Sequence, residues 1–213
     1  MKRLVKNLRR EFLIFWGIPK NIYMPISIFS IIFVIFTIID SNYLLGFSNV
    51  FIASLFTVFL MSESTYLDDY KSGFIEKKIC ETNDLEFYLI GKSLTQIILV
   101  FLPMVLISML YIGVNSEVFE EISIEKFVFS YLLFLITLKN FFYLGSAVSL
   151  KRNNALNALV IMPLLIPYFI ISNDVLLTNY NWGSSIYLMI AYFIFSDVFC
   201  NLITLKVLRI QSR

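Results

Sequence analysis

Long apolar runs separated by short polar turns dominate the chain. The runs cover about residues 22–39, 47–61, 89–114, 127–150, 155–172 and 184–205. A helix that crosses a bilayer needs about 20 predominantly apolar residues, and in lipid such a helix satisfies its own backbone hydrogen bonds. The pattern therefore predicts an all-α integral membrane protein with six transmembrane helices. An even number of spans places both termini on the same side of the membrane.

The first 20 residues have a different, amphipathic pattern. On a helical wheel one arc is apolar and the neighbouring arc is basic: Leu4, Val5, Leu8, Phe12, Phe15 and Trp16 form the first, and Lys2, Arg3, Lys6, Arg9 and Arg10 form the second. This favours an interfacial helix over residues 1–20, with its apolar face in the membrane and its basic face toward anionic lipid. The alternative is a disordered basic leader that only sets the topology.

Residues 62–88 form the one long polar interruption between two apolar runs. The second apolar run has no helix breaker up to Tyr70, Gly73 allows a sharp turn, and apolar and charged residues then alternate from Phe74 in a way that fits a short transverse helix. This segment predicts a rigid bracket that a soluble partner grips. It contains no recognisable arrangement of nucleophile, base and orienting group, so it does not resemble a catalytic site.

Composition limits the function classes. The chain of 213 residues is 59% hydrophobic and 15% charged, with a mean hydropathy of +0.81, and soluble domains average about 25% charged residues. We therefore expect a single membrane domain over residues 1–213 and no nucleic-acid partner. There is no histidine, the commonest metal ligand and general base, and Cys80 and Cys200 are isolated. We expect no catalytic residue, no bound metal and no directly bound cofactor, which leaves little support for a membrane-embedded enzyme.

The distribution of basic residues predicts the orientation. With six spans, 15 of the 17 lysines and arginines lie on the side that holds the termini and the polar segment 62–88. Cytoplasmic loops carry such an excess. We therefore expect both termini and residues 62–88 to face the cytoplasm.

Two charges and two prolines lie inside apolar runs. Lys139 is 12 residues from Phe127 and Asp197 is 12 residues from Ser185, at the outer ends of their runs, so they should lie at the same depth. Either charge alone would cost about 3 kcal/mol or more there, and we predict an intramembrane ion pair that serves either packing or a polar substrate path. Pro163 and Pro167 share a helix face and predict a kink that shapes packing or acts as a flexible joint.

Two motifs resemble a known family. Residues 68–76, with the sequence DDYKSGFIE, resemble the inner-loop motif of the heme exporter protein B family (CcmB), and the matching positions are Asp68, Asp69, Tyr70, Gly73, Ile75 and Glu76. Residues 162–167, MPLLIP, are similar to the PLLIP segment of that family. The chain departs from the family in being rich in Ile, Phe and Asn and poor in Ala.

The resemblance implies an ABC-2-like permease fold and a membrane subunit of an ABC-type complex in cytochrome c maturation. It implies pairing with the ATPase subunit CcmA through the six matching residues, a homodimer within the complex, and CcmC, CcmD and the haem chaperone CcmE as further partners. ATP and haem would be held by these partners. The implied location is the bacterial inner membrane, with the mitochondrial inner membrane as the alternative. An ABC-2-like permease that exports another cargo, such as a peptide or a lipid-linked molecule, is the second hypothesis.

Overall fold

The computed structural model describes residues 2–39, 46–82, 84–114, 124–150, 155–177 and 184–211. These residues are helical apart from short turns and contain no strand, which confirms the all-α prediction. The helices are α1 (Lys2–Gly17), α2 (Lys20–Ile39), α3 (Gly46–Ser64), α4 (Leu67–Lys71), α5 (Phe74–Lys77), η2 (Lys78–Thr82), α6 (Leu85–Gln96), η3 (Ile97–Phe101), α7 (Leu102–Val114), α8 (Ile124–Ser149), α9 (Ala155–Leu177) and α10 (Ser184–Gln211).

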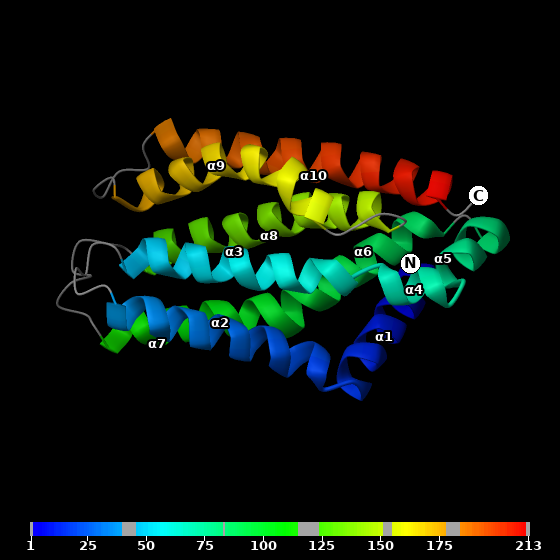
Figure 1. Ribbon diagram of the computed structural model, residues 1–213, viewed down its shortest axis with the longest axis horizontal. Coiled ribbons are helices and arrows are strands. Elements are labelled where there is room, and N and C mark those ends of the chain that lie inside the picture. Colours follow the sequence, from blue (N-terminus) through cyan, green and yellow to red (C-terminus); the bar gives the residue numbers. More distant parts are fainter. Residues whose placement is uncertain are drawn as a thin grey trace.

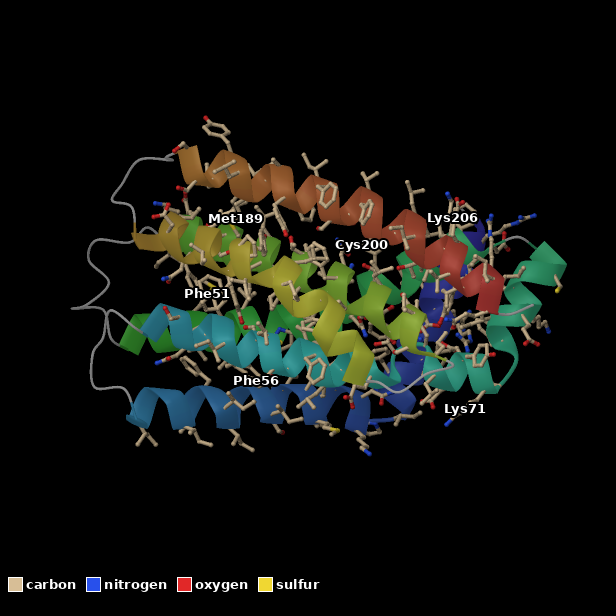
Figure 2. The ribbon with its side chains drawn as sticks, turned by 45° about the horizontal axis from the view of Figure 1, so that its top comes forward. Phe51, Phe56, Lys71, Met189, Cys200 and Lys206 are labelled. Atoms are coloured by element: carbon tan, nitrogen blue, oxygen red, sulfur yellow. The ribbon has the colours of Figure 1, made fainter. Side chains whose placement is uncertain are left out.

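The long helices run side by side along the longest axis of the molecule, and α1 leaves the bundle at an angle (Figure 1). The short helices α4 and α5 lie at one end, which also holds both ends of the chain; we call it the bracket end. Helix α8 lies centrally and contacts α3, α9 and α10. Lys71 and Lys206, from helices far apart in sequence, both lie at the bracket end (Figure 2).

Four helical segments are long and apolar enough to cross a membrane: Ser48–Lys71, Leu85–Leu110, Ile124–Ser149 and Ser184–Gln211. A fifth is obtained if Arg3–Gly17 and Lys20–Ile35, which meet at 68°, count as one broken span. Pro163–Val175 is a shorter apolar helix. The protein is thus a multi-pass membrane protein. Within the described residues, length and composition give four or five spans rather than the six that the apolar runs predict.

Aromatic rings fill the core of the bundle. Phe51 of α3 makes edge contacts with Phe134 of α8 and Phe169 of α9, at ring-centre distances of 4.5 and 6.1 Å. Two pairs of hydroxyl groups bond to each other between these helices: Ser54 Oγ with Tyr131 Oη at 2.6 Å and Thr137 Oγ1 with Tyr168 Oη at 3.1 Å. Such pairing matters because an unbonded hydroxyl is costly in an apolar interior. Interhelical contacts between rings therefore hold α3, α8 and α9 together.

The prolines are accommodated without ending their helices. A π-helical turn, Ile97–Phe101, ends two residues before Pro103, and such turns occur where the regular hydrogen-bond ladder of an α-helix is interrupted. Helix α9 continues through Pro163 and Pro167, and both prolines are exposed on the surface of the helix bundle. These two side chains point away from the neighbouring helices, so their predicted roles in packing or as a joint stay predictions.

Helix α1 confirms the predicted helix and adds a packing face that was not predicted. It packs against α6 with Asn7, Glu11 and Phe15 buried, whereas Val5 and Trp16 of the expected apolar face are exposed. Arg10 of the expected basic face turns inward to Asp69. The helical wheel did not predict this packing face, because ion pairs with neighbouring helices are absent from the wheel. Contact of the exposed apolar side chains with lipid stays a prediction.

The close approach of α1 to α6 depends on Gly91. A Cβ at this position would lie 3.2 Å from the Leu8 nitrogen and 3.4 Å from the Asn7 carbonyl carbon. We expect Gly91→Leu to displace α1 at a cost of about 1–3 kcal/mol from overpacking, and hence to speed tryptic cleavage after Arg10. Gly17→Leu is the matched control, because nothing lies within 4 Å of a Cβ there. Equal cleavage rates in both variants would contradict this docking.

Candidate functional site

The polar segment forms a bracket of three short helices, α4, α5 and η2 (Leu67–Thr82). Gly73 joins α4 to α5 with a φ of +69°, a backbone conformation that costs other residues roughly 1–2 kcal/mol. Its N–H donates to the Tyr70 carbonyl at 3.0 Å. The predicted order of helix, glycine turn and short transverse helix is therefore confirmed.

The six residues of the inner-loop motif separate into two groups. Asp68 and Glu76 are exposed, whereas Asp69 and Ile75 are 8% and 0% exposed. Tyr70 is half-buried and donates its hydroxyl to the Gln211 carbonyl of α10 at 3.3 Å, and Gly73 makes the turn. Only Asp68 and Glu76 of the motif are thus fully available to a partner, and the others shape the bracket.

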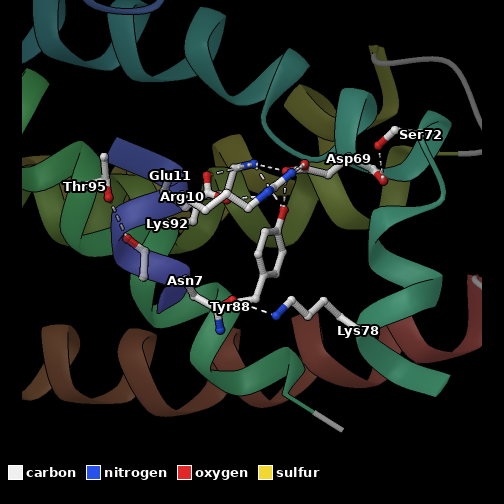
Figure 3. Close-up of polar contacts among 10 residues, drawn as sticks. Asn7, Arg10, Glu11, Asp69, Ser72, Lys78, Tyr88, Lys92 and Thr95 are labelled. Carbon is white, nitrogen blue, oxygen red and sulfur yellow. Dashed lines mark hydrogen bonds and ion pairs between the residues drawn. The ribbon is translucent and has the colours of Figure 1, made fainter. Parts of the chain in front are cut away.

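Asp69 lies at the centre of a buried polar network (Figure 3). Its Oδ1 accepts from Arg10 Nη2 of α1 at 2.7 Å. Its Oδ2 accepts from Lys92 Nζ at 2.5 Å and from the Tyr88 hydroxyl at 2.7 Å, both on α6. Tyr88 and Lys92 are one helical turn apart, so they reach the same carboxylate. One side chain of the bracket is therefore bonded to two other helices.

Glu11 completes the network, which we define as Arg10, Glu11, Asp69, Tyr88 and Lys92. Its carboxylate pairs with Arg10 at 2.5 Å and lies 3.8 Å from Lys92 Nζ. Two acids and two bases are thus held together with little access to water. Charged hydrogen bonds of this kind contribute about 1.5–3 kcal/mol each.

The two carboxyl groups differ in their electrostatics. Asp69 accepts charged hydrogen bonds from Arg10 and Lys92 and a third from the Tyr88 hydroxyl. Glu11 pairs closely with Arg10 alone and lies farther from Lys92. Asp69 is therefore the more strongly bonded acid of the network.

A second set of contacts ties the bracket to the rest of the bundle. Ile75 of α5 lies in an apolar cluster with Tyr88 and Leu89 of α6, Tyr143 of α8 and Leu208 of α10. Arg10 also stacks on Phe74, with its guanidinium carbon 3.4 Å from the ring centre. Polar and apolar contacts together fasten the bracket to α1, α6, α8 and α10.

Sequence reasoning missed four members of the network: Arg10, Glu11, Tyr88 and Lys92. Two signals were present. Glu11 is the only acid among the first 20 residues, and Lys92 follows Tyr88 by four positions at the start of an apolar run. Neither signal identifies the partner, because Arg10 and Asp69 are 59 residues apart in the chain.

Lys139 and Asp197 do not form the predicted ion pair. Lys139 donates to the Ser93 hydroxyl of α6, while Asp197 accepts from Asn140 at 3.3 Å and from Asn201 at 3.0 Å. Asp197 still interacts electrostatically with Lys139. Counting residues along two helices predicted their depth but not the direction in which each side chain points, and here Asn140 rather than Lys139 faces α10.

We therefore expect Lys139→Met to leave stability within about 1 kcal/mol of the parent, or to raise it. A single charge at this depth costs about 3 kcal/mol or more, so its replacement by an apolar side chain of similar size removes a cost, and Asp197 keeps its two amide donors. In a double-mutant cycle with Asp197→Asn, measured by thermal unfolding in detergent, the coupling energy should be about 0.5 kcal/mol or less. A coupling energy of several kcal/mol would instead show that Lys139 and Asp197 pair directly.

In the part of the chain that the structure describes, no group of three or more His, Cys, Asp or Glu side chains is arranged to hold a metal ion. Cys80 is exposed and Cys200 is buried in α10. The acids of the bracket end are used differently: Asp69 and Glu11 bond to bases, and Asp68 and Glu76 face outward. This arrangement holds helices together and presents charge, which suits contact with another protein.

Comparison with known proteins places the chain in a family. No curated protein matches it. The family model described as CcmB protein matches residues 4–205, a range that includes both motifs, the polar network and every helix of the bracket. The proteins of this family are membrane permease subunits of the haem exporter of cytochrome c maturation, and are not themselves catalytic. Because the match spans nearly all of its length, the chain belongs to the CcmB family.

Proposed function

We propose that this protein is a six-span, ABC-2-like membrane subunit that couples ATP hydrolysis on a separate ATPase subunit to haem transfer on the outer face. The transfer would be delivery of haem to a haem chaperone, or release of the loaded chaperone. The observation that carries this proposal is the structure of the bracket. Asp68 and Glu76 are exposed on it, while Asp69 and Ile75 attach it to α1, α6, α8 and α10.

The contacts explain how a movement would be transmitted. Gly73 makes a tight hydrogen-bonded turn, and Ile75 is fully buried. The exposed acids are therefore connected to the bundle by an ordered, well-packed segment, which would move as a unit when a partner pushes on it. Well-packed interiors transmit displacement because they are close to incompressible. Closure of the ATPase against Asp68 and Glu76 would therefore shift α6, α8 and α10 together.

The proposed arrangement in the membrane follows from charge and family. The bracket end would face the cytoplasm, since it carries most of the basic residues, and both termini lie at that end (Figure 1). In this proposal the whole chain is one membrane domain of the inner membrane, present as a homodimer with CcmA. CcmC, CcmD and CcmE are the further partners, and ATP and haem are bound by partners rather than by this subunit.

The test is co-purification of the ATPase subunit after the two proteins are expressed together. Asp68→Lys with Glu76→Lys should reduce recovered ATPase at least about tenfold, because like charges across an interface cost several kcal/mol. Glu86→Lys is the control, since Glu86 is also exposed but lies on α6 outside the bracket. The thermal unfolding midpoint of all variants should match the parent. Undiminished recovery of ATPase with the double variant would refute the proposed docking surface.

A further inference from the structure

Helix α10 lies at the edge of the bundle (Figure 1) and is the least covered of the four long apolar segments. Only 22% of its apolar part is buried within the chain, against 67% for α8. Lipid can cover its apolar side chains, such as Val198 and Leu202, each 56% exposed. Lipid cannot do the same for polar side chains, because acyl chains offer no hydrogen bonds.

Two polar side chains lie together in the middle of α10. Asp197 is 13 residues from Ser184 and 14 from Gln211, the two ends of the helix, so it lies near the mid-depth of a span. Asn201, one turn farther, is exposed, and Asp197 is half-buried. The Asn201 amide donates to Asp197 Oδ1 at 3.0 Å. We call these two residues the α10 patch; a charge that faces lipid at this depth is costly.

The α10 patch has hydrogen-bonding capacity that the chain does not use. Both hydrogen bonds that Asp197 accepts, from Asn140 and Asn201, end on Oδ1. In the described part of the chain, Asp197 Oδ2 and Asn201 Oδ1 accept none. Unlike Asn140 Oδ1, which is buried without a partner, these two oxygens are open to the outside of the bundle. Lys139 interacts with Asp197 only electrostatically and donates to Ser93 instead, so it does not cover them.

The α10 patch is confined to one depth. On the same side of the helix its neighbours toward the two ends are Ile194 and Leu205, both apolar, and Ile194 is 54% exposed. A polar path for a substrate places polar groups at successive depths, which this side of α10 does not. A single polar level in an apolar face is typical of contacts between transmembrane helices, which hydrogen-bond to each other there.

The charge of the patch selects the kind of helix that fits. In a two-fold dimer whose axis is normal to the membrane, the same residue lies at the same depth in both copies. A second copy packed on this face would therefore bring two Asp197 carboxylates together, and like charges repel strongly where the dielectric constant is low. A different helix that carries an N–H donor at this depth attracts the carboxylate instead.

We propose that the α10 patch binds a membrane-spanning helix of another subunit, whose mid-span carries an N–H donor such as an asparagine, glutamine, lysine or arginine side chain. The donor bonds Asp197 Oδ2, Asn201 bonds the partner beside it, and Ile194 and Val198 pack against the apolar part of that helix. The inference rests on the proposed function in one respect, that the protein works within a complex of several membrane subunits.

Photo-cross-linking in the assembled complex tests this contact. The protein is expressed with CcmA, CcmC and CcmD and carries p-benzoylphenylalanine in place of Ile194, which leaves the α10 patch intact. The control has the same group in place of Phe199, which is 44% exposed on another side of α10 at the depth of the patch. We expect at least about tenfold more cross-linking to CcmC or CcmD from position 194 than from position 199.

Two other results would overturn the proposal: a cross-link from position 194 to a second copy of this chain, and no cross-link to either membrane subunit. Recovery of CcmA from the same membranes tests the proposed function separately. If CcmA is recovered and position 194 stays unlinked, the contact on α10 is refuted and the proposed coupling to the ATPase is not.

Three variants connect the contact to the patch. In the protein labelled at position 194, Asp197→Leu should lower the cross-link at least about tenfold, whereas Asp197→Asn keeps an acceptor oxygen and should retain most of it. Asn201→Leu should lower the cross-link several-fold without changing the unfolding midpoint, because Asn201 is exposed. Phe199→Leu is the control and should have no effect. A cross-link that persists undiminished in both Asp197→Leu and Asn201→Leu refutes the α10 patch as the binding site.

Discussion

Lys92→Met is expected to lower the free energy of unfolding by about 3–5 kcal/mol. Removing one partner from a buried ion pair leaves an uncompensated charge, and this is the usual magnitude of that loss. Here Lys92 bonds Asp69 at 2.5 Å and lies 3.8 Å from Glu11, so its removal leaves two carboxylates with Arg10 alone. The loss should appear as a lower unfolding midpoint of the purified protein in detergent.

Two comparisons separate this effect from a general intolerance of substitution. Lys71→Met removes an exposed lysine from α4 and should leave the midpoint near that of the parent. Lys92→Met combined with Asp69→Leu should recover much of the loss, because Arg10 and Glu11 still pair with each other at 2.5 Å. If the double variant is as unstable as Lys92→Met, the network is not what holds α1, α4 and α6 together.

Ile75→Ala is expected to loosen the bracket and to impair the coupling function. Truncation of a fully buried isoleucine costs about 2–5 kcal/mol, and Ile75 joins α5 to side chains of α6, α8 and α10. The exposed acids remain in place, so the ATPase should still co-purify. Maturation of c-type cytochromes in cells should fall at least about tenfold, because the loosened bracket would no longer transmit the movement of the ATPase to α6, α8 and α10.

The control for Ile75→Ala lies at the same end of the bundle. Ile210 of α10 is 70% exposed, so Ile210→Ala removes the same atoms without opening a cavity. It should leave both cytochrome maturation and stability unchanged. Normal maturation with Ile75→Ala would show that the rigid contact to α8 and α10 is not needed for coupling.

The predictions for Lys92→Met and Ile75→Ala depend on the same feature, the attachment of the bracket to the bundle. The bracket presents few residues to a partner and uses the remainder to attach itself to the bundle. The family assignment identifies a membrane subunit of haem export in cytochrome c maturation, and the structure adds how the bracket is attached to the bundle. Of the six motif residues, Asp68 and Glu76 are suited to contact, whereas Asp69 and Ile75 are suited to transmission.

The amino-acid sequence by itself determined the all-α membrane class, the helix over the leader, the glycine turn at Gly73 and the family. These features depend on local periodicity, on backbone conformation or on short motifs, all of which are readable within a few neighbouring residues. The number of spans was not determined in this way, because the run 47–61 is only 15 residues long and four of them are polar, and prolines interrupt the run of α9. Both runs lie close to the lower limit of the length criterion.

Only the tertiary structure decided which charges meet. Arg10 and Lys92 reach the same carboxylate from helices far apart in the chain, and Lys139 points to Ser93 rather than to Asp197. A sequence pattern predicts the depth of a residue and the spacing of helix faces, but the rotation of one helix against another depends on all the contacts between them. The same contacts decided which face of α1 is buried and which residues of the motif are exposed.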